Sequence, residues 1–426
     1  MPRLHRVSPL PGDDAAAPDD DHREGGPGGT DRPPRDRRLW SRDFVLAMVV
    51  QLGVALVFMT LMTYMALYAG ERFGARDVAA GFAASAFILG SALARIVLGK
   101  YLDVIGRKRL LVSALLVYVA CSALYPLAGA YGVLVALRVV QGAAFGAATT
   151  AVTAGVLQMV PPSRRGEGMG YFLTASTVAN GVGPLLAVQL STAHGPAPVF
   201  LLVLGASVLA LGAAVVLRVP ELAGGPPPHA RRFRLRPGDV LDPDALPVAL
   251  VILIVSFGYA GIATYSTPFL LQAGLGTAAS LFFVALATGM LTVRLFSGRL
   301  QDRRGPNAVI LPLGALFTVA LVLLGVATEP WLVITAGLLA GLGYGGASPT
   351  LQVVAATRAR PERLGIATST HYLLLDTSIA FGPVVFGALI PLIGYRGHFL
   401  VLAATVLAGV VLYWFVHGRG HHGGRP

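Results

Sequence analysis

Charged residues are scarce in this sequence: they make up 13% of its 426 residues, whereas 55% are apolar. Soluble domains carry charge on about a quarter of their residues, so this composition excludes an ordinary water-soluble domain. Cys121 is the single cysteine, so no disulfide can form within the chain. The sequence also lacks a glycine-rich phosphate loop, a nucleophile elbow and metal-ligand spacing. We therefore predict neither an enzyme nor an ATP-driven protein, and no cofactor or metal site.

Long apolar runs are abundant instead. A helix needs about 20 apolar residues to cross the hydrocarbon core of a bilayer. Twelve runs meet this length: 44–69, 78–99, 110–130, 132–159, 169–191, 197–217, 247–272, 278–298, 308–327, 330–356, 366–390 and 397–417. The predicted fold class is an all-α membrane protein with twelve transmembrane helices, surrounded by a lipid bilayer.

The basic residues are confined to particular connections. The formal net charge is +12, which would suggest nucleic-acid binding if the charge covered one soluble face. Basic residues instead precede the first run and fill every second connection, as at Arg107–Arg109, Arg164 and Arg303. This alternation follows the positive-inside rule and predicts that both termini are cytoplasmic, in a bacterial plasma membrane. Because topology accounts for the charge, no nucleic-acid partner is expected.

The two halves of the chain repeat each other. GKYLDVIGRKRL at 99–110 returns as GRLQDRRGPNAV at 298–309, 199 residues later. The same offset pairs Arg95 with Arg294 and Gly183-Pro184 with Gly382-Pro383. Two homologous six-helix bundles are the architecture of many secondary transporters. The predicted organisation is a disordered cytoplasmic tail (1–41), a bundle (42–218), a cytoplasmic linker (219–246), a second bundle (247–417) and a short tail (418–426).

These features resemble the major facilitator superfamily over residues 44–417. GKYLDVIGRKRL resembles the family signature between the second and third helices, and LRVVQGAAFGA at 137–147 resembles its fourth-helix motif. ANGVGPLLA at 179–187 partly resembles the fifth-helix motif of drug:proton antiporters, with Ala179 and Leu186-Ala187 where that motif has glycines. RLGIATSTHYLLLDTSIAFGP at 363–383 resembles the efflux branch that includes metallophore exporters. The resemblance implies an alternating-access transporter that works as a monomer.

The repeated loop motif is expected to form a gate. An Asp three residues before a turn can accept hydrogen bonds from the free N–H groups that begin a neighbouring helix. The resemblance implies that Asp103 locks the cytoplasmic side closed while the outside is open, with Arg107 and Lys108 supporting it. A helix-end glycine lets a neighbour approach, and a turn glycine allows positive φ. The alternative is that the basic residues only set topology. The predicted gating residues are Gly99, Asp103, Gly106, Arg107, Lys108 and Asp302.

Few charged groups lie inside the predicted spans, where each costs about 2.5–3.5 kcal/mol on insertion scales. Asp376 is the single acid well inside a span, and its counterpart in the first half is Thr177. A buried acid near a cation can carry a proton, although a static pair with an Arg is the alternative. By resemblance, Arg138 influences proton transfer or binds an anionic group. Arg95 and Arg294 lie near the cytoplasmic ends of their spans, where they can snorkel to the interface.

The first span contains no Asp or Glu, whereas many proton-coupled members of the resembled family carry their acid there. Proton coupling is therefore assigned to Asp376 and Arg138. Side chains that could line a substrate cavity, or simply pack, are Tyr64, Gln141, Asn180, Tyr259, Tyr265, His371 and Tyr372. The predicted function is proton-coupled export of a small organic molecule. A nutrient-uptake symporter and a non-transporting membrane sensor or scaffold are the alternatives.

Overall fold

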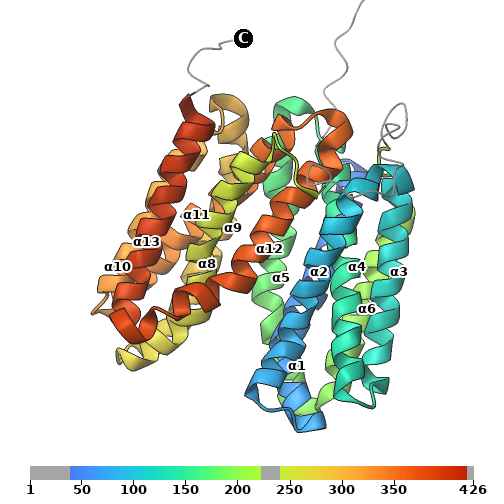
Figure 1. Cartoon of the computed structure of the whole chain (residues 1–426), viewed down its shortest axis with the longest axis horizontal. Helices are drawn as coiled ribbons and strands as arrows, with labels where there is room; N and C mark the ends of the chain where they lie inside the picture. Colours follow the sequence, from blue (N-terminus) through green and yellow to red (C-terminus); the bar gives the residue numbers. More distant parts are fainter. Residues whose placement is uncertain (1–38, 222–239, 420–426) are drawn as a thin grey trace, which may run out of the picture. The chain divides into compact units, whose positions relative to one another are not determined.

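The computed structural model describes residues 39–221 and 240–419, and its regular elements in these ranges are helices (Figure 1). The long helices of the first half are α1 (Arg42–Phe73), α2 (Asp77–Ile105), α3 (Arg107–Leu124), α4 (Tyr131–Met159), α5 (Arg165–His194) and α6 (Pro196–Val216). Those of the second half are α8 (Leu246–Gln272), α9 (Gly276–Arg304), α10 (Asn307–Val326), α11 (Pro330–Arg358), α12 (Leu364–Gly387) and α13 (Ile390–Val416). Short 3₁₀ helices lie at Tyr125–Leu127, Pro162–Arg164 and Pro361–Arg363. The predicted all-α fold with twelve long helices is confirmed.

Eleven of the long helices in the described ranges are long and apolar enough to cross a membrane. The remaining one, α12, has 24 residues but carries Asp376, His371 and a run of Ser and Thr, which lowers its apolar character. Large apolar side chains such as Leu201 and Val384 are exposed on the outer faces of the helices, at 68% and 69%. Such exposure is expected where lipid, and not water, surrounds the protein.

Each half has its own apolar core. One cluster of buried residues extends from Leu39 to Leu217 along the chain and includes Val353, Ala356 and Leu364 of the second half. The other lies wholly within the second half, between Ala245 and Tyr413. The first core therefore crosses into the second half at the end of α11 and the start of α12.

Small residues let particular helices pack closely. A Cβ on Gly146 of α4 would lie 2.7 Å from the carbonyl oxygen of Ser91 on α2. A Cβ on Gly345 of α11 would lie 2.8 Å from the Cα of Met290 on α9. The G-x-x-x-G patterns of α4 and α11 thus pack these helices against α2 and α9.

The loops after α2 and α9 begin at the predicted turn glycines. Gly106 has φ 92° and Gly305 has φ 81°, a region that side chains other than glycine avoid. These turns lie at the ends of the helices that carry the basic connections, and we call these ends the basic face. Gly74, at the opposite end of α1, also has positive φ, at 64°, and closes that helix.

The predicted tails and linker fall largely outside the described residues, since 1–38, 222–239 and 420–426 are not among them. The boundaries proposed for these segments stay predictions.

Candidate functional site

A cavity of about 200 Å³ lies between the halves. Its walls come from α1, α2, α4 and α5 on one side and from α8, α9, α11 and α12 on the other. Aromatic and aliphatic side chains of the wall alternate with polar ones that converge on the cavity, a combination found in small-molecule sites. Asp376, Arg95 and Arg294 are the charged groups in this wall.

Asp376 and Arg95 form an ion pair across this cavity. Asp376 comes from α12 and Arg95 from α2, so the pair joins the two halves. The side chain of Asp376 keeps 15% exposure, whereas that of Arg95 keeps 1%. Ser91, one turn before Arg95, donates a hydrogen bond of 3.1 Å to the same carboxylate. The carboxylate is therefore held by a cation and a hydroxyl while one side of it faces the cavity.

Arg95 does not snorkel to the interface, contrary to expectation. Its guanidinium donates to the carbonyl oxygen of Tyr372 at 3.3 Å and to the Thr149 hydroxyl at 3.3 Å. It also lies over the Tyr372 ring, 4.7 Å from the centroid. Ser369 in turn donates to the Arg95 carbonyl oxygen at 2.7 Å. The acid, hydroxyls and ring of the other helices hold Arg95 inside, because they satisfy its charge more fully than a route to the interface would.

A second set of contacts between the halves lies at the basic face, where α9 packs against the start of α5. Asp302 accepts hydrogen bonds from the backbone N–H groups of Gly166 and Glu167, at 2.8 and 2.9 Å. These are free N–H groups of the first helical turn, so the carboxylate caps α5. A Cβ on Gly166 would lie 2.6 Å from the carbonyl oxygen of Gly298, which explains why both positions are glycine. Asp302, in the second copy of the motif, thus makes a helix-capping contact, and its gating role stays a prediction.

Glu167 strengthens the same contact. Its carboxylate pairs with Arg164 in its own half at 2.8 Å and with Arg299 of α9 at 2.8 Å. The α5–α9 contact thus combines a helix cap, an ion pair and glycine-to-glycine packing.

Arg107 and Lys108 lie on the first half. Glu221 accepts hydrogen bonds from their backbone N–H groups, at 2.8 and 3.0 Å. The Lys108 ammonium binds carbonyl oxygens at the end of α6, among them that of Val215 at 2.8 Å. The contacts described for Lys108 therefore stay within one half. Gly99 and Asp103 belong to α2, but their side-chain positions lie outside the described part, so the gating role of Asp103 stays a prediction.

The cavity contains four of the seven residues predicted to line it: Asn180, Tyr259, His371 and Tyr372. Tyr259 stacks on Tyr344, with 4.4 Å between ring centroids. The Tyr372 hydroxyl lies 3.1 Å from that of Thr153. These aromatic groups belong to the wall because their helices, α8, α11 and α12, face the first half.

The other three predicted lining residues lie elsewhere. Tyr64 is buried within the first half beside Phe200, with 5.9 Å between ring centroids. Gln141 accepts a hydrogen bond of 2.6 Å from the Tyr125 hydroxyl. Tyr265 donates to the carbonyl oxygen of Pro383 at 2.6 Å. None of the three is in the wall of the cavity described above.

Arg138 lies in a buried network of the first half and also outside that wall. Its guanidinium donates to the carbonyl oxygens of Ala83 and Ala84, at 3.1 and 2.8 Å, and stacks over Phe87 at 4.7 Å. Gln141 accepts from it at 3.5 Å. The structure does not bring Arg138 to Asp376, and its part in proton coupling stays a prediction.

Eight polar residues of the wall were not predicted as site residues: Gln51, Ser91, Arg95, Thr149, Ser176, Arg294, Ser348 and Gln352. Gln51 donates to the Ser176 hydroxyl at 2.8 Å, which links α1 to α5. Gln352 is 2% exposed and lies four residues before the end of the apolar span predicted at 330–356. The signal available in the sequence was that the polar side chain of Gln352 shares a helix face with Tyr344. Within the described ranges, no cluster of three or more His, Cys, Asp or Glu side chains could hold a metal ion.

A family model of the Major Facilitator Superfamily matches residues 47–383 and 310–425. An uncharacterized MFS-type transporter of Burkholderia mallei is 26% identical over 357 residues, which are 82% of this chain and 86% of that protein. The uncharacterized MFS-type transporter YhhS of Salmonella typhimurium is 28% identical over 173 residues, or 40% of this chain. That second match spans only 42% of the relative's own length.

Solved structures show the same fold. The human organic anion transporter MFSD10 has a TM-score of 0.75 at 19% identity, covering 89% of this chain and 99% of that chain. The proton:xylose symporter XylE, bound to 6-bromo-6-deoxy-D-glucose, has a TM-score of 0.70 at 15% identity, covering 88% and 95%. At such identities the likeness concerns the arrangement of helices.

Proposed function

The chain belongs to the Major Facilitator Superfamily, a family of secondary transporters and not of enzymes, and we propose that it exports a small organic molecule in exchange for protons. It is a multi-pass membrane protein with relatives in bacteria. We place it in the bacterial plasma membrane with both termini in the cytoplasm, because the positive-inside rule assigns the basic face to that side. The basic face is then the cytoplasmic gate.

The Asp376–Arg95 pair carries this proposal. Its carboxylate is the acid in the cavity wall, it faces the cavity, and it bonds a cation of the opposite half. A carboxylate in this position can take a proton from water that enters the cavity. Protonation removes its negative charge and with it the attraction to Arg95, so the link between α2 and α12 weakens. Proton binding would thereby favour separation of the halves at the basic face.

Exchange of protons for substrate follows from the protonation of Asp376. When the basic face opens, the proton is released to the cytoplasm and the empty cavity takes up the substrate. The carboxylate can then pair with Arg95 again, which closes the basic face with the substrate facing outward. Each protonation state thus favours one direction of access, as alternating access requires.

Export is favoured over uptake by the fifth helix. Gly183, in the stretch resembling the antiporter motif, packs against α1, where its Cβ would lie 2.7 Å from that of Met59. Thr60 of α1 donates to the Gly183 carbonyl oxygen at 3.4 Å. The fifth-helix antiporter motif would bring α1 and α5 into such a close contact. An uptake symporter would need the same proton site, so the direction has to be measured in vesicles of known orientation.

Replacing Asp376 tests the coupling. Compounds that stabilise the purified protein against heat would first be selected, and their flux then measured in proteoliposomes with an imposed pH gradient. We expect Asp376→Asn to abolish the stimulation of flux by the gradient, since Asn cannot take up or release the proton. Asp244→Asn is the matched control, because Asp244 is exposed in the turn before α8. Gradient-driven flux that survives in Asp376→Asn would remove this residue from the mechanism.

A further inference from the structure

We infer that the transported molecule is an amphipathic organic anion whose negative group binds Arg294. This inference rests on the proposed transport function and names its substrate class. It starts from the internal repeat, which makes Arg294 of α9 the counterpart of Arg95 and makes Thr177 of α5 the counterpart of Asp376. Arg95 in the cavity wall is therefore paired with a carboxylate, that of Asp376. At the position equivalent to Asp376 in the other repeat, Thr177 offers only a hydroxyl to Arg294.

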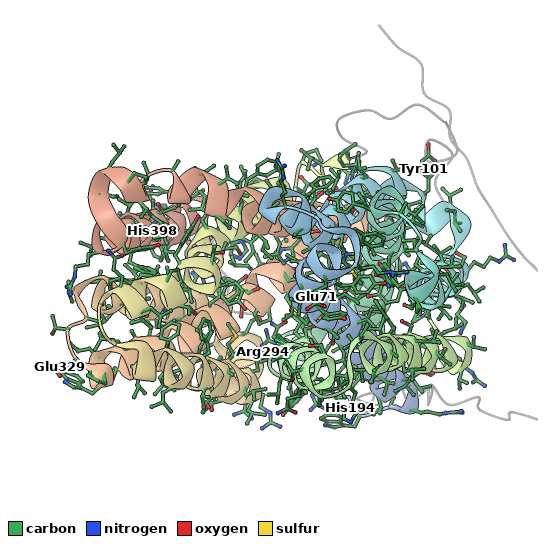
Figure 2. The ribbon with its side chains drawn as sticks, turned by 90° about the horizontal axis from the view of Figure 1, so that it is seen from below. Glu71, Tyr101, His194, Arg294, Glu329 and His398 are labelled. Atoms are coloured by element: carbon green, nitrogen blue, oxygen red, sulfur yellow. The ribbon has the colours of Figure 1, made fainter. Side chains whose placement is uncertain are left out.

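The contacts of Arg294 confirm that its charge is not neutralised by a described residue. No carboxylate among the residues the structure describes is within ion-pairing distance of it. Its guanidinium donates instead to the carbonyl oxygens of Leu173 and Gly345, the latter at 3.4 Å. Figure 2 shows Arg294 beside the green ribbon of α5, where the two halves meet. Carbonyl groups accept its hydrogen bonds but carry no net charge.

The cavity wall consequently has one positive charge in excess, from two guanidinium groups and one carboxylate. A charge inside a membrane protein that lacks a counter-charge is unfavourable and usually marks a functional site. A guanidinium binds carboxylate, sulfonate or phosphate oxygens in a fork geometry. One excess positive charge fits a ligand with one negative charge.

A buried polar atom in the same cavity wall as Arg294 also lacks a partner. Gln352 is 2% exposed and lines the cavity, and its amide nitrogen is buried without a hydrogen-bond partner in the described structure. Gly345, Ser348 and Gln352 follow one another at helical spacing, so the Arg294 contact and the Gln352 amide share one face of α11. A buried donor without a partner is unfavourable by itself. An anionic group at Arg294 would supply acceptors for both.

The opposite wall carries an aromatic cluster. Phe58, Phe87 and Phe145 of the first half form a cluster with 4.9–5.2 Å between ring centroids, and all three line the cavity. A ligand that fills the cavity would therefore place its charged group toward the second half and an apolar, preferably aromatic, body toward the first.

Equilibrium binding of a charge-matched panel tests the inference. The probes are 2-naphthoate, 2-naphthalenesulfonate, the neutral 2-naphthamide and the cationic 2-naphthylmethylamine, which share one aromatic body. Binding would be measured on the purified full chain by thermal shift, without a proton gradient. We expect both anions to bind and the amide and amine to bind at least about tenfold more weakly, because they lack the charge that pairs with Arg294.

Two pairs of variants separate the charge of Arg294 from effects on folding. Arg294→Gln should weaken anion binding about tenfold or more, and Arg294→Lys should retain part of it. Arg303→Gln is the control, because it removes the same charge from an exposed position on α9. Thr177 and Arg294 both bond the Leu173 carbonyl oxygen, so Thr177→Asp should pair with Arg294 and suppress anion binding. Thr177→Asn should not.

Three results would overturn the inference: no binding of either anion, equal binding of the amide or amine, or anion binding that Arg294→Gln leaves unchanged. This outcome is distinguishable from failure of the proton-coupling proposal. The binding assay uses no gradient and leaves Asp376 intact, whereas the Asp376→Asn flux assay can fail while anion binding persists.

Discussion

At the scale of single residues, the Asp376–Arg95 pair is better explained by function than by stability. Bringing two charges out of water is unfavourable, and apolar replacements for buried ion pairs are often neutral or stabilising. The other half of the molecule has Thr177 at the equivalent position, so the fold does not need the carboxylate of Asp376. In the proposed mechanism, the pair provides a link between the halves that a proton can break.

A mutant cycle tests whether the pair is energetically coupled. Arg95→Gln should destabilise the protein by up to about 3–5 kcal/mol, because it leaves a carboxylate buried without its cation. Adding Asp376→Asn removes that carboxylate, so the double variant should unfold at a higher temperature than Arg95→Gln alone. Thermal unfolding in one detergent measures both. A double variant no more stable than Arg95→Gln would mean that the two side chains act independently.

The sequence predicted one member of this pair and missed the role of the other. Asp376 stood out because an acid inside an apolar run is rare. Arg95 did not stand out, because it lies close enough to the basic end of α2 for its side chain to reach the membrane–water interface. Which face of α2 meets α12 depends on how the two halves pack, and helical spacing within one segment does not contain that information. The same limit hid the environment of Arg294.

At the scale of helices, the α5–α9 contact closes the basic face. Asp302 caps α5, Arg299 pairs with Glu167, and the backbones meet at Gly166 and Gly298. The chemistry of this contact could be predicted from the motif, since Asp before a turn glycine suits a helix N-terminus. The sequence predicted it for both copies of the motif, and the structure describes it for the second.

Removing the cap should weaken this closure. Asp302→Ala leaves the first N–H groups of α5 without their acceptor, which costs about 1 kcal/mol and shifts the closed–open equilibrium about fivefold toward opening. Ser369 is buried between the halves toward the basic face, so the alkylation rate of Ser369→Cys in a Cys121→Ala background reports opening. We expect that rate to rise about fivefold. An unchanged rate would show that the cap does not hold this gate.

Lys108 should behave differently from Asp302, because its described bonds go to the end of α6 in its own half. Lys108→Met removes a cation from the carbonyl groups at that helix end and should lower the free energy of unfolding by about 1–3 kcal/mol. Gradient-driven flux, normalised to folded protein, should not change. Flux that falls while the unfolding temperature stays constant would instead assign Lys108 to the gate, as the family resemblance implied.

At the scale of the whole molecule, the bonds between the halves are unevenly distributed. Within the described ranges, the bonds between the halves lie near the middle of the helices or at the basic face. The Arg95–Asp376 pair lies near the middle, and the Glu167–Arg299 pair lies at the basic face. The cavity is lined by the Arg95–Asp376 pair together with Asn180, Tyr259 and the Phe cluster. The repeated halves and the twelve spans could be predicted from the sequence. Which end of the molecule is closed could not be predicted, because the same sequence must be compatible with both access states.

Distances between the halves at both ends test alternating access driven by Asp376. Spin labels at exposed positions would report the basic face (Ser163 with Arg303) and the opposite face (Thr192 with Ala273), again with Cys121→Ala. On acidification we predict that the 163–303 distance lengthens while the 192–273 distance shortens, and that Asp376→Asn shows the long 163–303 distance at every pH. Distances that lengthen together at both faces, or that respond to pH equally well without Asp376, would contradict the account.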